Sequence, residues 1–117
     1  MRAEGSGGWR LTPRAEEALV EIALWTIRRF GAAQADAYEA ELIGRCEALA
    51  RGDLPGQDCS VLAGEGARGL RFVRAGRHFV VYVEIGAEVV VLDVIHGRAD
   101  LPRRLETLRG RGTMPPR

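Results

Sequence analysis

Residues 70–95, LRFVRAGRHFVVYVEIGAEVVVLDVI, indicate the fold class of this chain. It contains three apolar runs with short glycine-containing breaks between them: 70–74, 77–84 and 88–95. The break at Ala75-Gly76 is a two-residue hairpin signal, and the middle run alternates between two faces as a β-strand does. The third run is apolar on both faces except at Asp93, as expected for a strand that is covered on both sides. These features predict an antiparallel β-meander.

Upstream of the meander, the sequence predicts one short strand and two helices. Residues 9–11 are expected to form the strand, and Thr12 and Pro13 then provide an N-cap and a first helical residue. Apolar residues at helical spacing continue to Gly31, a plausible stop, and a second amphipathic helix is predicted over 33–50. Because few residues join them, the two helices are expected to form an antiparallel hairpin.

The remaining segments complete a single α+β domain. Residues 51–69 are rich in Gly, Pro and Asp and are expected to be a loop, and Asp100 is expected to cap a short C-terminal helix. The fold class is therefore a two-layer α+β domain, in which an N-terminal antiparallel helix hairpin packs on an antiparallel meander. We expect a flexible leader over 1–8, one domain over 9–108 and a disordered tail over 109–117.

Composition excludes several classes of protein. The chain has 117 residues, is 46% hydrophobic and has a formal net charge of +1, as expected for one ordinary globular domain. All 17 basic residues are arginine. No apolar run is long enough to cross a membrane and no secretory signal is present, so a cytoplasmic location is expected. The cysteines, Cys46 and Cys59, are expected to be reduced thiols, and no ligand spacing predicts a metal site.

Two motifs that suggest catalysis or cofactor binding fail on their context. Residues 64–69 read GEGARG, a literal G-x-G-x-x-G, but loop precedes this motif and a strand follows it. A dinucleotide site requires the opposite order, strand before and helix after, so no cofactor is expected. Cys59 has His78 and His96 elsewhere in the chain, but nothing in the sequence places them together as a nucleophile and base.

A polar cluster on the meander leaves two interpretations open. Four of its members are of the types that hold and cleave a phosphodiester, since Arg stabilises charge and His or Tyr moves protons: Arg71, Arg77, His78 and Tyr82. The alternative is that these side chains line a solvated surface or flank the helices. The residues alone do not decide between a catalytic set and an ordinary surface.

Three segments resemble the ParE/RelE superfamily of bacterial toxins. WRLTPRA at 9–15, followed by a helix with Ile22 and Trp25, resembles the opening of ParE-family toxins. LRFVRAGRHFVVY at 70–82 is similar to their central hairpin. The most specific part is VLDVIHGRADLPRRL at 91–105, in which a hydrophobic-His-x-Arg-x-Asp run leads into a final short helix. The resemblance extends over most of the chain.

The resemblance implies the toxin of a type II toxin–antitoxin pair, neutralised by a small antitoxin protein. ParE-like members are expected to inhibit DNA gyrase without being enzymes, and RelE-like relatives cleave mRNA on the ribosome. The closing His-x-Arg-x-Asp run, the absence of lysine and the near-neutral charge favour the ParE branch. A ribosome-dependent nuclease using the Arg71, Arg77, His78 and Tyr82 set stays open, as does a degenerate toxin that only binds its antitoxin.

Site residues follow from the same resemblance. For contact with the target, or for support of that surface, we expect the C-terminal residues His96, Arg98, Asp100, Arg103 and Arg104. For contact with the antitoxin, we expect residues on the helix hairpin: Leu19, Ile22, Trp25, Phe30, Tyr38 and Leu42. An amphipathic segment of the antitoxin would use apolar anchors for affinity and acidic residues for the arginines.

Overall fold

The computed structural model describes residues 8–112 of the chain. The elements follow the order β1 (Trp9–Leu11), α1 (Pro13–Phe30), α2 (Ala32–Arg51), β2 (Gln57–Asp58), α3 (Ser60–Ala63), η1 (Glu65–Ala67), β3 (Arg71–Ala75), β4 (His78–Ile85), β5 (Glu88–His96) and α4 (Leu101–Gly112). This order confirms the predicted α+β class, with a helix hairpin before a β-meander and a short helix after it.

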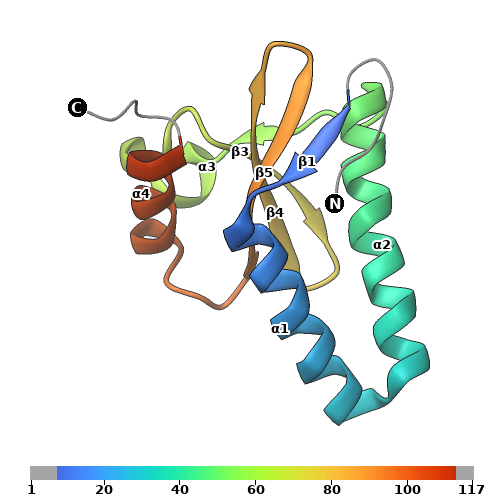
Figure 1. Ribbon diagram of the computed structural model, residues 1–117. Helices are drawn as coiled ribbons and strands as arrows, with labels where there is room; N and C mark the ends of the chain where they lie inside the picture. The colour runs from blue at the N-terminus through green and yellow to red at the C-terminus, as the bar shows by residue number, and fades with distance from the viewer. Residues whose placement is uncertain (1–7, 113–117) are drawn as a thin grey trace.

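Capping residues set the limits of the helix hairpin. The Thr12 side chain accepts a hydrogen bond from the Ala15 N–H at 3.1 Å, and Pro13 occupies the first helical position, as predicted. Helix α1 ends at Phe30, and α2 follows after the single residue Gly31. The two helices lie side by side and run in opposite directions (Figure 1).

The sheet has five strands in the order β1-β5-β4-β3-β2. The meander β3–β4–β5 is antiparallel throughout, as the sequence predicts. Strand β1 joins it in parallel to β5, with Trp9 opposite Val89 and Leu11 opposite Val91. The sheet is therefore mixed, and the start of α1 lies beside the middle of β5.

Both hairpin turns in the meander begin with glycine. Residues 76–77 connect β3 to β4, so the turn lies one residue later than the predicted Ala75-Gly76 break. Gly76 has a φ of +58° and Gly86, which opens the β4–β5 turn, has +61°; within the described residues no non-glycine has a positive φ. A positive φ at the first turn position alone is typical of the type II′ turn, which matches the right-handed twist of the strands.

The interpretation of 51–69 as a loop is wrong in part, because this segment contains β2, α3 and η1. The Asp58 carboxylate ties the segment together: it accepts hydrogen bonds from the Ser60 N–H at 2.8 Å and the Gly69 N–H at 3.1 Å. These backbone bonds lower the pKa of Asp58. These elements are too short to show a periodic pattern, and the many Gly and Pro residues of the segment indicate a loop instead.

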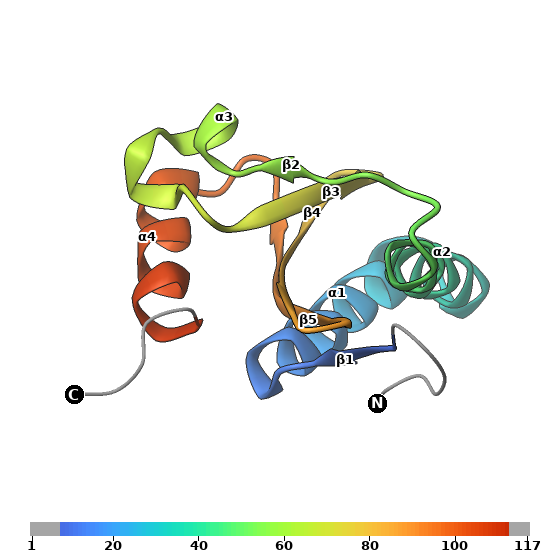
Figure 2. The same cartoon turned by 90° about the horizontal axis from the view of Figure 1, so that it is seen from above.

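Helices lie on both sides of the sheet (Figure 2), and an apolar core cluster lies between the sheet and the helices on each side. One core cluster joins the α1–α2 hairpin to residues such as Val80, Tyr82 and Val91, and the other joins α3, η1 and α4 to residues such as Val81 and Leu92. The β4–β5 register shifts by one residue, since Val81 pairs with Asp93 and Tyr82 with Val91, which leaves Leu92 unpaired. This β-bulge places Asp93 out of the simple alternation expected for the strand.

The ends of the domain differ from the predicted boundaries. Helix α4 continues to Gly112, so regular structure extends beyond residue 108, where the domain was expected to end. Residues 1–7 of the predicted leader and 113–117 of the predicted tail lie outside the described residues. Among the described helices, none combines the length and the apolar character that a membrane span requires.

Candidate functional site

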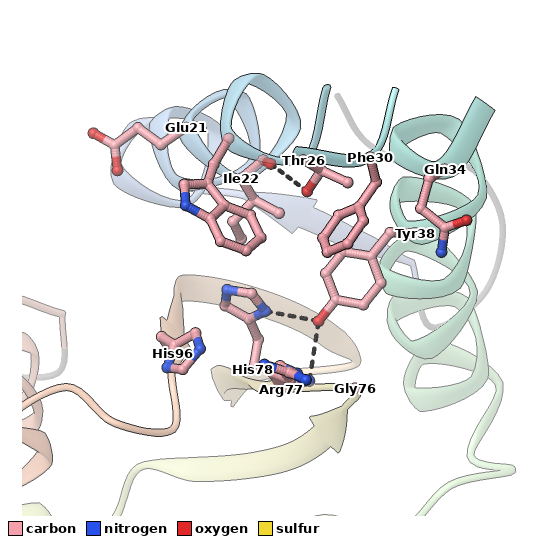
Figure 3. A pocket seen from close by; sticks show the side chains of 11 residues that line it. Glu21, Ile22, Thr26, Phe30, Gln34, Tyr38, Gly76, Arg77, His78 and His96 are labelled. Atoms are coloured by element: carbon pink, nitrogen blue, oxygen red, sulfur yellow. Dashed lines mark hydrogen bonds between the residues drawn. The ribbon is translucent and has the colours of Figure 1, made fainter. Parts of the chain in front are cut away.

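An open pocket of about 500 Å³ lies between the distal half of the helix hairpin and the β3–β4 turn (Figure 3). Its helical wall combines the apolar Ile22, Trp25 and Phe30 with the polar Glu21, Thr26 and Gln34, and polar side chains also line it at the end of the sheet. The pocket is lined by Glu21, Ile22, Trp25, Thr26, Phe30, Gln34, Tyr38, Gly76, Arg77, His78 and His96. Its walls therefore come from α1, α2, β4 and β5, which the hairpin topology brings together.

A hydrogen-bond network centred on Tyr38 fixes the polar end of this pocket (Figure 3). The Tyr38 hydroxyl has one proton, which it donates to the Ala75 carbonyl at 2.8 Å, and its oxygen accepts from the Arg77 N–H at 3.3 Å. The remaining contact, 2.7 Å to His78 Nδ1, therefore has His78 as the donor. In this neutral form His78 keeps an unprotonated Nε2, which is able to accept a further hydrogen bond.

The two histidines of the pocket lie edge to face, with ring centroids 5.2 Å apart. Burial lowers the pKa of His78 to about 4, and the adjacent His96 ring contributes to the shift. Burial also raises the pKa of Tyr38, so its hydroxyl stays protonated. His96 Nδ1 accepts the Arg98 backbone N–H at 3.0 Å. Near neutral pH the Tyr38–His78 network is therefore uncharged.

Two exposed aromatic residues form the rim of the pocket. Trp25 is 47% exposed and Phe30 is 61% exposed, and their rings meet edge to face with centroids 6.0 Å apart. The Arg29 guanidinium lies 5.2 Å from the centre of the Trp25 ring, at cation–π distance. Large apolar rings at the mouth of a pocket are typical of a protein–protein contact.

Helix α1 also carries a second apolar stripe away from this pocket. Val20, Leu24 and Ile27 recur at spacings of four and three residues and are 58%, 50% and 45% exposed. A hollow of about 310 Å³ beside this stripe includes Leu19 and Ile43. Helix α1 therefore has exposed apolar side chains that its packing on the sheet leaves uncovered.

Most of the residues predicted to contact an antitoxin lie on these surfaces. Four of them line the pocket: Ile22, Trp25, Phe30 and Tyr38. Leu19 is half-buried beside the second hollow. Leu42 is only 2% exposed and packs in the core beneath the hairpin, so the inclusion of this residue in the contact surface is wrong.

The residues considered as a nuclease set are not brought together. Arg71 pairs with Tyr82 near one end of the β3–β4 hairpin, whereas Arg77 and His78 lie at its turn. Tyr82 is 1% exposed, within the core. The Arg71 Nη2 donates to the Gly56 carbonyl at 2.6 Å. The tyrosine that contacts His78 is Tyr38, which the sequence analysis predicted as an antitoxin contact and not as a member of this set.

A second polar cluster lies where α1 begins beside α4. Asp93, on β5, is 1% exposed. Its Oδ2 accepts from Arg14 Nε and from Arg104 Nη2, each at 3.3 Å, and its Oδ1 accepts from the Val94 N–H at 2.7 Å. One buried carboxylate thus connects the first turn of α1, the β5 bulge and α4. Arg14 did not figure among the residues expected at this site.

The residues predicted to touch the target do not form a single site in the structure. His96 lies in the hairpin pocket against His78. Arg98 and Asp100 are exposed in the connection from β5 to α4. Asp100 caps α4 as predicted: its carbonyl accepts from the Arg104 N–H at 3.0 Å, and its side chain lies 3.5 Å from the Arg103 N–H.

Arg103 and Arg104 lie together at a cleft of about 380 Å³ beside Asp93. The cleft is lined by Thr12, Arg14, Leu92, Asp93, Arg103, Arg104, Thr107 and Leu108. Arg104 is held by Asp93, so part of its function is to support the fold. Arg103 is exposed, and neither Asp93 Oδ atom is bound by its side chain.

Comparison with known proteins gives consistent matches. Residues 9–101 match the family described as ParE toxin of type II toxin-antitoxin system, parDE. Toxin ParE of Escherichia coli is 36% identical over 102 residues, which are 86% of this chain and 95% of that protein. The solved chromosomal ParDE TA system from P. aeruginosa has a similar fold, with a TM-score of 0.62 at 15% identity, over 75% of this chain and 92% of that chain.

The matches first define a class, the toxins of type II toxin–antitoxin systems. The family match spans the opening strand, the helix hairpin and the whole meander, and the structural match shows the same fold. The chain belongs to the ParE toxin family. This membership confirms the resemblance that the closing His-x-Arg-x-Asp run suggested.

Proposed function

We propose that this chain inhibits DNA gyrase and that a cognate antitoxin neutralises it by binding over the α1–α2 hairpin. Membership of the ParE family supports the first half, since gyrase is the target that the resemblance implies. The observation that carries the second half is the exposed apolar surface of α1 around Trp25 and Phe30. Gyrase and its DNA are cytoplasmic in bacteria, and we place the toxin there too.

The hairpin pocket has the chemistry that an antitoxin segment requires. Apolar anchors of the partner would fill the space between Trp25, Phe30 and Ile22, and water-excluding contacts of this kind supply most of the affinity of an interface. Arginines at the end of α1, Arg28 and Arg29, offer partners for acidic side chains. We therefore expect an amphipathic antitoxin segment with acidic residues beside its apolar anchors.

The arrangement of the meander favours gyrase inhibition over mRNA cleavage. A nuclease that used His78 with Tyr82 would need both side chains to reach one substrate. Tyr82 is buried in the core, and it lies further along β4, away from the turn where His78 lies. We assign the target-binding surface instead to the exposed Arg98, Asp100 and Arg103 and to Arg104 at the cleft.

The direct test is a supercoiling assay with purified toxin, gyrase of the same host and ATP, with and without the antitoxin. We expect loss of supercoiling and trapped linear DNA, both relieved by the antitoxin. Arg103→Ala is expected to weaken inhibition at least tenfold, and Arg51→Ala, which removes another exposed arginine at the end of α2, serves as the control.

Three results would contradict the proposal or part of it. If gyrase stayed fully active, ribosome-programmed mRNA cleavage would be the activity to test next. If induction also left cell growth unimpaired, the chain would be a degenerate toxin that only binds its antitoxin. Full inhibition by Arg103→Ala together with Arg104→Ala would refute the C-terminal target surface while leaving gyrase as the target.

A further inference from the structure

The cleft between the start of α1 and α4 has more positively charged than negatively charged side chains. Three guanidinium groups line it, those of Arg14, Arg103 and Arg104, against one buried carboxylate, that of Asp93. Both ion pairs of Asp93 use the same oxygen, Oδ2, at 3.3 Å from Arg14 Nε and from Arg104 Nη2. Arg14 also pairs with Glu17, so three guanidinium groups face two carboxylates and leave one positive charge in excess at this cleft.

The geometry keeps donor groups available for a ligand. A guanidinium has five N–H donors, and Asp93 takes one from Arg14 and one from Arg104. The side chains of these two arginines are 46% and 38% exposed, so their free edges are open to solvent. The ion pair of Arg14 with Glu17 is long: Glu17 Oε1 lies 3.9 Å from Arg14 Nη1, beyond hydrogen-bond distance, so it occupies no N–H donor.

Two further features favour an anion at this position. Thr12 lines the cleft as the N-cap of the 18-residue helix α1, whose N-terminal end carries the positive pole of the helix dipole. The cleft volume of about 380 Å³ is roughly ten times the 30 Å³ that a water molecule occupies in the liquid. The cleft therefore has room for a tetrahedral anion with its nearest waters.

We propose that this cleft is a binding site for a phosphate group and that its ligand is the phosphodiester backbone of DNA. Arginine binds phosphate through paired N–H donors, and guanidinium groups held by a buried carboxylate are already oriented for it. The DNA source rests on the proposed function, because a gyrase complex presents a dense row of phosphates to the bound toxin. Arg14 and Arg104 would orient the phosphate, and Arg103 would bind it from the open side.

The test is an NMR titration of the ¹⁵N-labelled full chain without gyrase, at constant ionic strength. The probes are sodium phosphate, a short DNA duplex and sodium acetate. We expect phosphate and DNA, but not acetate, to shift the signals of Arg14, Val94, Arg103 and Arg104. Because gyrase is absent, the result is independent of the supercoiling assay: either proposal is able to fail alone.

Arg103→Gln is the informative variant, because it leaves the Asp93 ion pairs in place. It is expected to weaken DNA binding about tenfold, the effect of losing one charged hydrogen-bond donor. It should also reduce the slope of log affinity against log salt by about one. Arg51→Gln makes the same charge change at an exposed site and is expected to alter affinity less than twofold. If Arg103→Gln does not fold, Arg103→Lys keeps the charge but removes the planar donor pair.

Each of four outcomes would overturn the proposal. Absence of shifts with phosphate and DNA would refute the site. Shifts with phosphate but not with DNA would refute the DNA source. Equal shifts with acetate would show a general carboxylate site for an acidic protein segment. If Arg51→Gln weakened DNA binding as much as Arg103→Gln, the loss of affinity would come from the change in net charge and not from this site.

Discussion

The hairpin pocket and the α1–α4 cleft are built in the same way but differ in their chemistry. In each, a side chain on a strand is bound by side chains of the surrounding helices: His78 by Tyr38 in the pocket, and Asp93 by Arg14 and Arg104 in the cleft. The pocket network is neutral and its rim is aromatic, whereas the cleft network is charged and its arginines are partly exposed to solvent. One small domain thus presents two surfaces of different chemistry.

The largest effect on stability is expected in the cleft. Replacing both Arg14 and Arg104 with Met keeps the apolar stems but leaves the buried Asp93 carboxylate without a cation, which costs about 3–5 kcal/mol. Each single replacement is expected to cost much less, since the other arginine still pairs with Asp93. Urea unfolding of the single and double variants measures this as a double-mutant cycle.

Arg51→Met is the control for that cycle, because its ion pair with Asp53 is exposed on both sides. We expect it to change the free energy of unfolding by less than about 0.5 kcal/mol. If the losses in the free energy of unfolding for Arg14→Met and Arg104→Met simply added up in the double variant, neither arginine would compensate for the loss of the other at Asp93.

The hairpin pocket is expected to make the stability of the fold depend on pH, through His78. The pKa of His78 is about 4 in the folded protein, against an ordinary value of 6.5, so the unfolded chain binds more protons between these limits. Stability should therefore be fully present above pH 6.5 and fall as the pH decreases toward 4, by about 2 kcal/mol once partial solvation of the ring is allowed for.

His78→Gln should remove this dependence, because glutamine does not titrate. The comparison is made by urea unfolding of the two proteins at several pH values within that window. Equal slopes in wild type and His78→Gln would mean that the ring is solvated in the folded state and that the Tyr38–His78 network does not keep it neutral.

Much of the fold could be predicted because its signals are local. Thr12 and Pro13 mark the start of α1 within four residues of sequence, and the alternation and glycine turns of 70–95 define the meander. The short elements between 51 and 69 could not be predicted, since β2 depends on β3 for its hydrogen bonds and α3 is a single turn. Such elements follow from tertiary pairing rather than from a local pattern.

The sites could be predicted only in part because their contacts are distant in sequence. Tyr38 and His78 are 40 residues apart, and Arg14 and Asp93 are 79 apart. The sequence indicates the residue types but not which of them meet. The Leu92 bulge also breaks the strand alternation, so the pattern alone does not show which groups surround Asp93. Leu42 was misplaced for a related reason: helical spacing does not show which positions of a stripe the core buries.

Growth after induction of variants, with and without the antitoxin, shows whether antitoxin and target bind separate surfaces. Because the native Phe30 is 61% exposed, Phe30→Ser should change the free energy of unfolding by less than about 0.5 kcal/mol. We expect Phe30→Ser with Trp25→Ser to remain toxic but escape neutralisation, and Arg103→Gln to lose toxicity but still bind the antitoxin. Loss of toxicity and of antitoxin binding together in both variants would contradict the two-surface account.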